Sequence, residues 1–253
     1  MTRTRPICII LVAVCGCASA APDEIEPYYE STKSDGSRPK LKLRDDDKLH
    51  VDEPSDLVFS GGKLYTVSDR HSKIYEITKG GDVEDELDVE AQDLEALSVD
   101  PDGHFVIADE SDTKVWFVNK DGERTKSFDV DDVDDGNSGI EGLAFDDDGH
   151  LYVAKEKDPA RIYKLDKNGD ELDRKKIELA DDLSALAWNP RDGHLYALSD
   201  NEQSLFRLDK DFDADAAWRL PVDHPEGIAF DGKSLYVVSD SEQRIYEFEL
   251  ADD

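Results

Sequence analysis

The sequence predicts an all-β fold, a five-bladed β-propeller built from four-stranded blades. One unit recurs five times, and its first strands start at positions 56, 95, 141, 184 and 226, which are 39, 46, 43 and 42 residues apart. This spacing matches the length of one propeller blade. Turn glycines lie between the first two strands of every unit, at 61–62, 103, 149, 193 and 232. Such turns are typical of tight antiparallel hairpins.

Each unit predicts the same order of strands. A short apolar strand follows an acidic or polar residue, at 56–59, 95–98, 141–144, 184–187 and 226–229. A second strand follows the turn and ends in an acid, at 64–67, 105–108, 151–154, 195–198 and 235–238. A third strand starts with an aliphatic and an aromatic residue, at 74, 115, 162, 205 and 245. Four units then show a fourth strand, so the units are complete blades except for the fifth.

The fifth unit shows no fourth strand before Asp253, but a matching segment occurs upstream of the first unit. Pro39–Leu43 resembles Lys175–Leu179 and stands at the corresponding distance before a first strand. We expect this N-terminal strand to complete the last blade, because closing the ring removes a bare sheet edge. The propeller domain is therefore expected over residues 39–253.

The first residues have the features of an export signal. Arg3 and Arg5 precede the apolar stretch Ile7–Val14, which is too short to cross a bilayer. Gly16 followed by Cys17 resembles a bacterial lipobox, so residues 1–17 are expected to be a signal peptide and Cys17 the lipidated residue. The alternative is ordinary secretion after cleavage at 18–20, an A-x-A pattern. Residues 18–38 are polar and predict a tether. The protein is thus expected in the cell envelope, anchored at the outer membrane or the periplasmic face.

The composition limits the partners. The formal net charge is −32, from 62 acidic and 30 basic side chains, which disfavours nucleic acid as a partner. All three cysteines lie within the first 17 residues, so the domain has no disulfide, thiol nucleophile or cysteine metal ligand. Acids are spread along the whole chain, as in proteins adapted to high salt. Only a local pattern above this acidic background can indicate a site.

Two columns of acids are predicted to meet at one end of the central channel. The first strand of a blade lines the channel and the second runs antiparallel to it, so the start of one and the end of the other lie together. The first column comprises Asp56, Glu95, Glu141, Ser184 and Glu226. The second comprises Asp69, Asp109, Glu156, Asp200 and Asp240, with Lys155 as an added cation.

Converging carboxylates repel one another, and three outcomes relieve the repulsion. A hard cation such as Ca²⁺ can bridge them, they can take up protons, or they can bind backbone N–H groups between blades. We expect Ca²⁺ as the cofactor, with Glu95, Glu141, Glu226 and Asp56 as ligands. The second column, Lys155 and Ser184 are expected either to contact a ligand or to have a structural role.

No catalytic residue is predicted. His104, His150 and His194 share one repeat position after a turn glycine, which favours a structural role in the turn. The sequence shows no Ser–His–Asp spacing, no phosphate-binding loop and no dinucleotide fingerprint.

Several strings resemble the SdiA-regulated family of bacterial envelope propellers: Asp93-Leu94-Glu95-Ala96-Leu97, Gly139-Ile140-Glu141-Gly142-Leu143 and His224-Pro225-Glu226-Gly227-Ile228. The resemblance covers roughly residues 40–250 and implies an exported propeller with a link to calcium and no established reaction. More distantly the chain is similar to gluconolactonase-like and phytase-like propellers, which hold a divalent ion with acids in the channel. It departs from the gluconolactonase-like pattern, which has six blades and an Asn–Asp pair.

Three functions follow. The first is a non-catalytic envelope module that binds a divalent cation or a protein partner at its acidic mouth. The second is a metal-dependent hydrolase of a phosphoester or lactone, in which an ion held by acids activates water. The third is a scaffold whose acidity is only adaptation to salt. The sequence favours them in the order first, third, second, and leaves the oligomeric state open.

Overall fold

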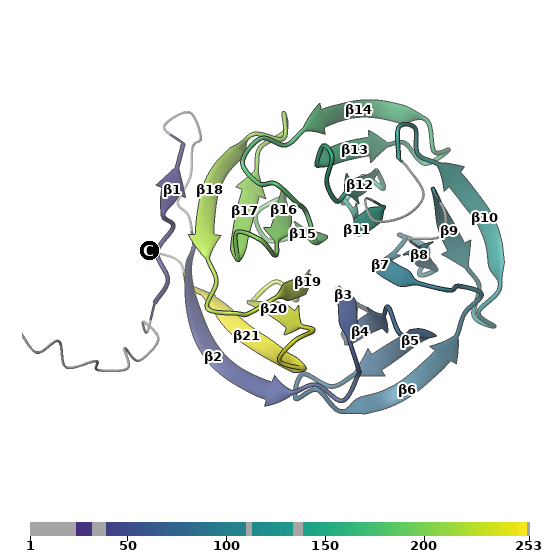
Figure 1. The fold of residues 1–253 in the computed structure, drawn as a ribbon, viewed down its shortest axis with the longest axis horizontal. Coiled ribbons are helices and arrows are strands. Elements are labelled where there is room, and N and C mark those ends of the chain that lie inside the picture. The colour runs from purple at the N-terminus through teal and green to yellow at the C-terminus, as the bar shows by residue number, and fades with distance from the viewer. Residues whose placement is uncertain (1–23, 32–38, 110–112, 134–138, 252–253) are drawn as a thin grey trace, which may run out of the picture.

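The structure is a computed structural model that describes residues 24–31, 39–109, 113–133 and 139–251. Five antiparallel sheets surround a central channel, as Figure 1 shows, so the predicted five-bladed propeller is confirmed. Blade 1 consists of β3 (Pro54–Ser60), β4 (Lys63–Ser68), β5 (His71–Ile77) and β6 (Val83–Asp88). Blade 2 consists of β7 (Leu94–Val99), β8 (Phe105–Asp109), β9 (Lys114–Val118) and β10 (Arg124–Asp129). Blade 3 consists of β11 (Ile140–Phe145), β12 (Leu151–Lys155), β13 (Arg161–Leu165) and β14 (Glu171–Lys176).

The last two blades use strands from the N-terminal part of the chain. Blade 4 consists of β15 (Ala185–Asn189), β16 (His194–Ser199), β17 (Ser204–Leu208) and β18 (Ala214–Arg219), with β1 (Tyr29–Glu30) added outside β18. Blade 5 consists of β19 (Pro225–Phe230), β20 (Ser234–Ser239), β21 (Arg244–Ala251) and β2 (Lys40–Lys48). Strand β2 pairs antiparallel with β21 from Lys40 to Lys48, so the expected closure of the last blade is confirmed and extends five residues beyond Leu43.

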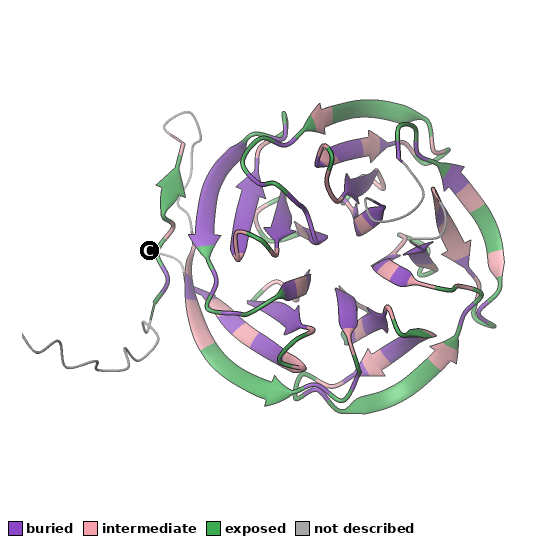
Figure 2. Ribbon diagram, viewed as in Figure 1, coloured by how far each residue is buried: buried purple, intermediate pink, exposed green. Residues whose placement is uncertain are grey.

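The core lies between the blades, because each blade packs its faces against its two neighbours. Strands β12, β16 and β20 are buried or nearly buried along their whole length, whereas β6 and β14 on the outer rim are mostly exposed, as Figure 2 shows. Apolar residues therefore fill both faces of the inner strands, and charged residues occupy the rim.

The innermost strands approach one another very closely. A Cβ atom added to Gly227 on β19 would lie 2.6 Å from the backbone carbonyl carbon of Asp56 on β3, and one added to Gly142 would lie 2.7 Å from the backbone nitrogen of Leu186. Both distances are shorter than a van der Waals contact. The absence of a side chain at these two glycines is therefore what lets neighbouring blades meet at the channel.

Residues 24–31, which we call the strap, join the outer edges of blades 4 and 5. Ile25 is buried and exchanges two backbone hydrogen bonds with Leu41 on β2, of 2.7 and 3.1 Å. Tyr28 N–H and Ser31 N–H donate to the carbonyl groups of Ala217 and Asp215 on β18. The expectation of a tether over 18–38 is therefore wrong for residues 24–31, while the rest of that range lies outside the described residues.

The sequence of β18 explains why the strap binds there. The outer strands of blades 1 and 3 are rich in charge, which blunts an exposed edge against pairing. Strand β18 reads ADAAWR and is buried except for Arg219. Its Trp218 is fully buried and donates its indole N–H to the Pro39 carbonyl oxygen at 3.1 Å. An apolar edge of this kind needs cover, and the strap supplies it.

Within the described part of the chain, no helix has the length and apolar character needed to cross a membrane. The predicted signal peptide and the predicted lipidation site, Cys17, lie outside the described residues.

Deletion of the two N-terminal elements should have graded effects. A chain starting at residue 39 loses the buried Ile25 and the strap's backbone hydrogen bonds, so we expect its free energy of unfolding to fall by about 2–4 kcal/mol. A chain starting at residue 49 also loses β2, which exposes β21, and it should melt far lower or fail to fold. Thermal melting of both, against a control starting at residue 24, checks this. Equal melting temperatures for the starts at 24 and 49 would contradict the closure.

Candidate functional site

A cavity of about 220 Å³ opens at the channel end where first strands begin and second strands end. Its lining is almost wholly acidic. Every blade contributes at least one carboxylate, although the second-column acid of blade 2 is not among them. The carboxylates are Glu53, Asp69, Glu95, Glu141, Glu156, Asp182, Asp200, Glu226 and Asp240. Ser55, Ser184, Pro54 and Lys157 complete the lining. The predicted convergence of the two columns is thus present for seven of their acids, together with Ser184, and we call this cavity the acidic mouth.

A backbone bulge sets which first-strand residue faces the mouth. In blades 2, 3 and 5 the register shifts between the residues that flank the glutamate, so Glu95, Glu141 and Glu226 are the bulged residues. In blade 1 the same shift falls between Pro54 and Asp56, which makes Ser55 the equivalent residue. The assignment of Asp56 to this column is therefore wrong by one position.

Asp56 instead ties two blades together. Its side chain is fully buried, and its two carboxylate oxygens accept hydrogen bonds from the backbone N–H groups of Leu57 and Leu97, at 2.7 and 2.8 Å. Burial raises the pKa of Asp56 well above its usual range, although these two hydrogen bonds lower it. Asp56 does not line the acidic mouth, and its oxygens are already used.

The two serines of the first column make similar links between blades. The Ser55 hydroxyl donates to the Leu94 carbonyl oxygen at 2.6 Å, and the Ser184 hydroxyl donates to the Pro225 carbonyl oxygen at 2.9 Å. Each acceptor directly precedes a mouth glutamate, Glu95 or Glu226. The serines therefore fix the backbone that carries the neighbouring glutamates.

The second column is also displaced in one blade. Asp109 pairs with Leu94 at the level where Ser68, Lys155 and Ser239 stand in other blades. It is buried, accepts a hydrogen bond from Gln92 N–H, and forms an ion pair with Arg124 at 2.7 Å. The next residue, Glu110, has the sequence position that matches Asp69, but it lies outside the described residues.

Lys155 does not reach the acidic mouth. It is buried, and its ammonium group donates to the carbonyl oxygen of Lys157. Lys157 lines the cavity in its place and forms an ion pair with Glu156 at 2.5 Å. The lysine at the mouth therefore lies in the predicted blade but two residues further along the chain, beyond the end of β12.

Three charged lining residues, Glu53, Asp182 and Lys157, lie outside the columns that the sequence predicted. Glu53 and Asp182 lie in the connections that precede first strands, where the five units differ in length and do not align. Asp182 is buried and accepts hydrogen bonds from the Ser199 hydroxyl and from Asn201 N–H. The sequence signal for Asp182 is its place two residues before Ser184, and in so acidic a chain an acid at this place does not stand out.

Glu226 is a strongly perturbed acid of the mouth. Burial, reinforced by the neighbouring charges of Asp200, Asp240, Glu95 and Asp182, raises its pKa to about 9. In the adjacent blade 1, burial and the nearby Glu53 raise the pKa of Asp69 to about 6. The mouth therefore holds more negative charge than it can keep ionised in the absence of a cation.

Asp200 has a local cation. Burial raises its pKa, while His224, whose Nδ1 lies 3.2 Å from Asp200, opposes the rise. The same contact raises the pKa of His224. His224, which directly precedes β19, thus contacts a lining residue.

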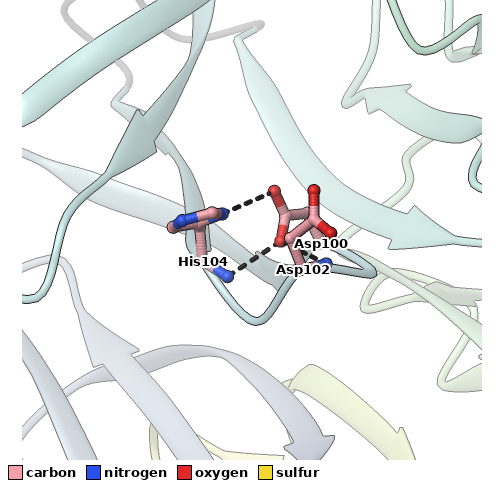
Figure 3. Close-up of side chains that lie close together, drawn as sticks. All are labelled: Asp100, Asp102 and His104. Atoms are coloured by element: carbon pink, nitrogen blue, oxygen red, sulfur yellow. Dashed lines mark hydrogen bonds and ion pairs between the residues drawn. The ribbon is translucent and has the colours of Figure 1, made fainter.

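Two further acidic clusters lie in hairpin turns at the other end of the channel. Figure 3 shows Asp100, Asp102 and His104, whose ligand atoms lie within 4.8 Å of one another. Asp100 accepts hydrogen bonds from the backbone N–H groups of Asp102 and His104 at 2.9 and 2.8 Å, and lies 3.1 Å from the His104 ring. Asp146 and His150 repeat this arrangement in blade 3. These contacts close the turns.

Asp56→Asn tests whether this acid is structural. The amide would turn a donor toward one of the two N–H groups that the carboxylate now accepts, which leaves a buried donor unsatisfied. We expect the free energy of unfolding, measured by chemical denaturation, to fall by about 2 kcal/mol. Ser184→Ala is the control and should lose about 1 kcal/mol. Unchanged stability in Asp56→Asn would contradict the role as a link between blades.

Glu226→Gln tests the charge at the mouth. A carboxyl whose pKa is raised in the folded state binds more protons folded than unfolded, so stability falls as pH rises from about 4.5 toward about 9. In the presence of a chelator at pH 8, the free energy of unfolding of the variant should exceed that of the parent by roughly 1–3 kcal/mol, after allowance for solvent screening. The difference should vanish near pH 4.5. A parent whose stability rises between pH 6 and 9 relative to the variant would contradict this.

Comparisons place the chain among known propellers. Similar structures include a glutaminyl cyclase from Myxococcus xanthus (TM-score 0.66, 10% identity, covering 84% of this chain and 97% of that one). Another is virginiamycin B lyase from Staphylococcus aureus (TM-score 0.56, 12% identity, 83% and 99%). A third is the WD40 propeller domain of Doa1 (TM-score 0.53, 16% identity, 76% and 62%). At these identities the likeness shows the fold alone.

No curated protein matches the sequence. The family model described as SdiA-regulated matches residues 46–249, which covers all five blades. This range contains the Glu95, Glu141 and Glu226 strings on which the resemblance was based, and the chain belongs to the SdiA-regulated family.

Proposed function

We propose that this protein is a non-catalytic binding module of the cell envelope, which takes up a divalent cation, Ca²⁺ in the first instance, at its acidic mouth. The observation that carries the proposal is the set of carboxylates around a 220 Å³ cavity with Lys157 as the one cation in its described lining. Oxygen ligands are those that Ca²⁺ prefers.

Two acids supply the strongest support. One oxygen of Asp69, Oδ1, is buried without a hydrogen-bond partner. Glu226 makes no hydrogen bond or ion pair with the residues described here, and its pKa is raised to about 9. The unsatisfied buried oxygen of Asp69 and the crowded negative charge at Glu226 both cost free energy, and a bound cation would offset these costs.

The spacing of the acids indicates how the ion would be held. Among the described residues, three ligand atoms come within 4.8 Å of one another only in the two hairpin turns, and not at the mouth. The cavity has room for about seven waters at roughly 30 Å³ each. We therefore propose an ion that keeps much of its water, with Glu226, Glu95 and Asp240 nearest to it.

A hydrolase of phosphoesters or lactones has less support. Its substrate would need a cationic contact, and Lys157 is already paired with Glu156 at 2.5 Å. The remaining carboxylates would repel a phosphate. The scaffold adapted to salt remains the alternative, and the experiment below separates it from cation binding.

Lipidation of Cys17 would hold this module at the envelope, which is part of the same proposal. No contact with a protein partner is needed for the cation site, although the mouth is open to one.

The test is thermal melting of residues 24–253 in high NaCl, with Ca²⁺ or Mg²⁺ added at constant ionic strength. Saturation at a hundredfold excess over Kd stabilises by about 2.7 kcal/mol, which corresponds to a rise of about 5–10 °C in Tm. Glu95→Gln/Glu141→Gln/Glu226→Gln should lose this rise.

A matched control removes equal charge elsewhere. Glu84→Gln/Glu90→Gln/Glu178→Gln changes three exposed acids away from the mouth and should keep the Ca²⁺-dependent rise. If Ca²⁺ and Na⁺ stabilise equally at matched ionic strength, or if both triple variants lose the response alike, the acidity is general adaptation to salt and the proposal is wrong.

A further inference from the structure

The strap exposes two aromatic side chains on the outer rim. Ile25 is buried against blade 5, but Tyr28 and Tyr29 are 55% and 43% exposed. They are two of only five large hydrophobic residues that are exposed among the described residues. In Figure 1 the strap lies outside β18, on the side of the ring opposite β10. Exposed tyrosines of this kind are typical of surfaces that meet the polar region of a bilayer.

Binding of the strap also shortens the path from the anchor to the domain. With a free tether, Cys17 would be separated from Lys40 by up to about 80 Å of extended chain. Because the strap is fixed on the rim from Glu24 onward, only seven residues remain, which reach about 25 Å at most. The anchor therefore restrains one side of the ring rather than a freely rotating propeller.

The charge of this rim differs from that of the outer edge of blade 1. Lys42 on β2 and Arg219 on β18 form no ion pair with described residues, and Arg219 lies 5.9 Å from the Tyr28 ring. By contrast, β6 of blade 1 exposes four acids in six residues: Glu84, Asp85, Glu86 and Asp88. In a chain with a net charge of −32, the strap side therefore repels an anionic headgroup less than the β6 edge does.

We propose that the outer rim formed by the strap and the edges of blades 4 and 5 rests on the membrane surface, with Tyr28 and Tyr29 at the headgroups. The channel axis then runs along the membrane, and the acidic mouth opens sideways to solvent. This inference rests on the proposed lipid anchor at Cys17 and not on cation binding.

The experiment uses the full lipoprotein, extracted from membranes and reconstituted into vesicles of phosphatidylethanolamine and phosphatidylglycerol that contain a nitroxide-labelled lipid. Apart from Cys17 the mature chain has no cysteine, so one introduced cysteine carries one fluorophore. Glu30→Cys reports the strap, Thr125→Cys reports the opposite rim on β10, and Arg70→Cys reports the loop at the mouth. We expect quenching by the lipid at Glu30→Cys to exceed that at the other two positions at least twofold.

Two variants test the cause of this orientation. Tyr28→Ser/Tyr29→Ser removes the exposed rings without touching the core and should reduce the difference in quenching. Ile25→Ser releases the strap and should abolish it, and a circular dichroism melt shows whether the propeller still folds. Equal quenching at the three positions, or the strongest quenching at Arg70→Cys, would overturn the proposal.

A separate control identifies failure of the anchor. The parent should float with the vesicles and Cys17→Ser should not. If the parent also fails to float, both the anchor and the orientation are overturned, whereas the melting response to Ca²⁺ is unaffected.

Discussion

Closure of the ring is the constraint on which the rest of this structure depends. Five blades can surround a channel only if the last blade finds its fourth strand, and β2 supplies it by pairing with β21 over nine residues. Because β2 is the outermost strand of blade 5, the residues that precede it in the chain must lie along the outer rim. The strap follows from this, because it passes the apolar edge of β18 and covers Trp218.

The same closure creates the electrostatic problem at the mouth. Repetition places equivalent strand ends at equal positions around one axis, so an acid that recurs in the unit becomes a ring of acids. The protein relieves part of the repulsion itself. Ser55 and Ser184 replace glutamate in two blades, Lys157 neutralises Glu156, and His224 contacts Asp200. Glu226 has no such partner among the described residues, and its pKa is raised to about 9.

Departures from the repeat are as informative as the repeat. Asp56 occupies the position of Gly142 and Gly227, where neighbouring inner strands almost touch, and its carboxylate uses the small space to bind two backbone N–H groups. Asp109 similarly takes the place of a serine and pairs with Arg124. Both acids belong to the architecture, whereas the bulged glutamates face the cavity. A shift of one residue in register therefore decides whether a carboxylate links blades or faces the cavity.

The sequence by itself determined the number of blades, the order of strands and the end of the channel where acids gather, because each depends on local periodicity and turn chemistry that repeat five times. It also predicted closure by the segment at Leu41, since the fourth strand missing from one end is found at the other. Only the tertiary structure decided which acids face the mouth, that Lys157 rather than Lys155 lines it, and that residues 24–31 bind the rim. A bulge adds one residue without altering the hydrophobic pattern, and the edge of β18 becomes available to the strap only after the ring has closed.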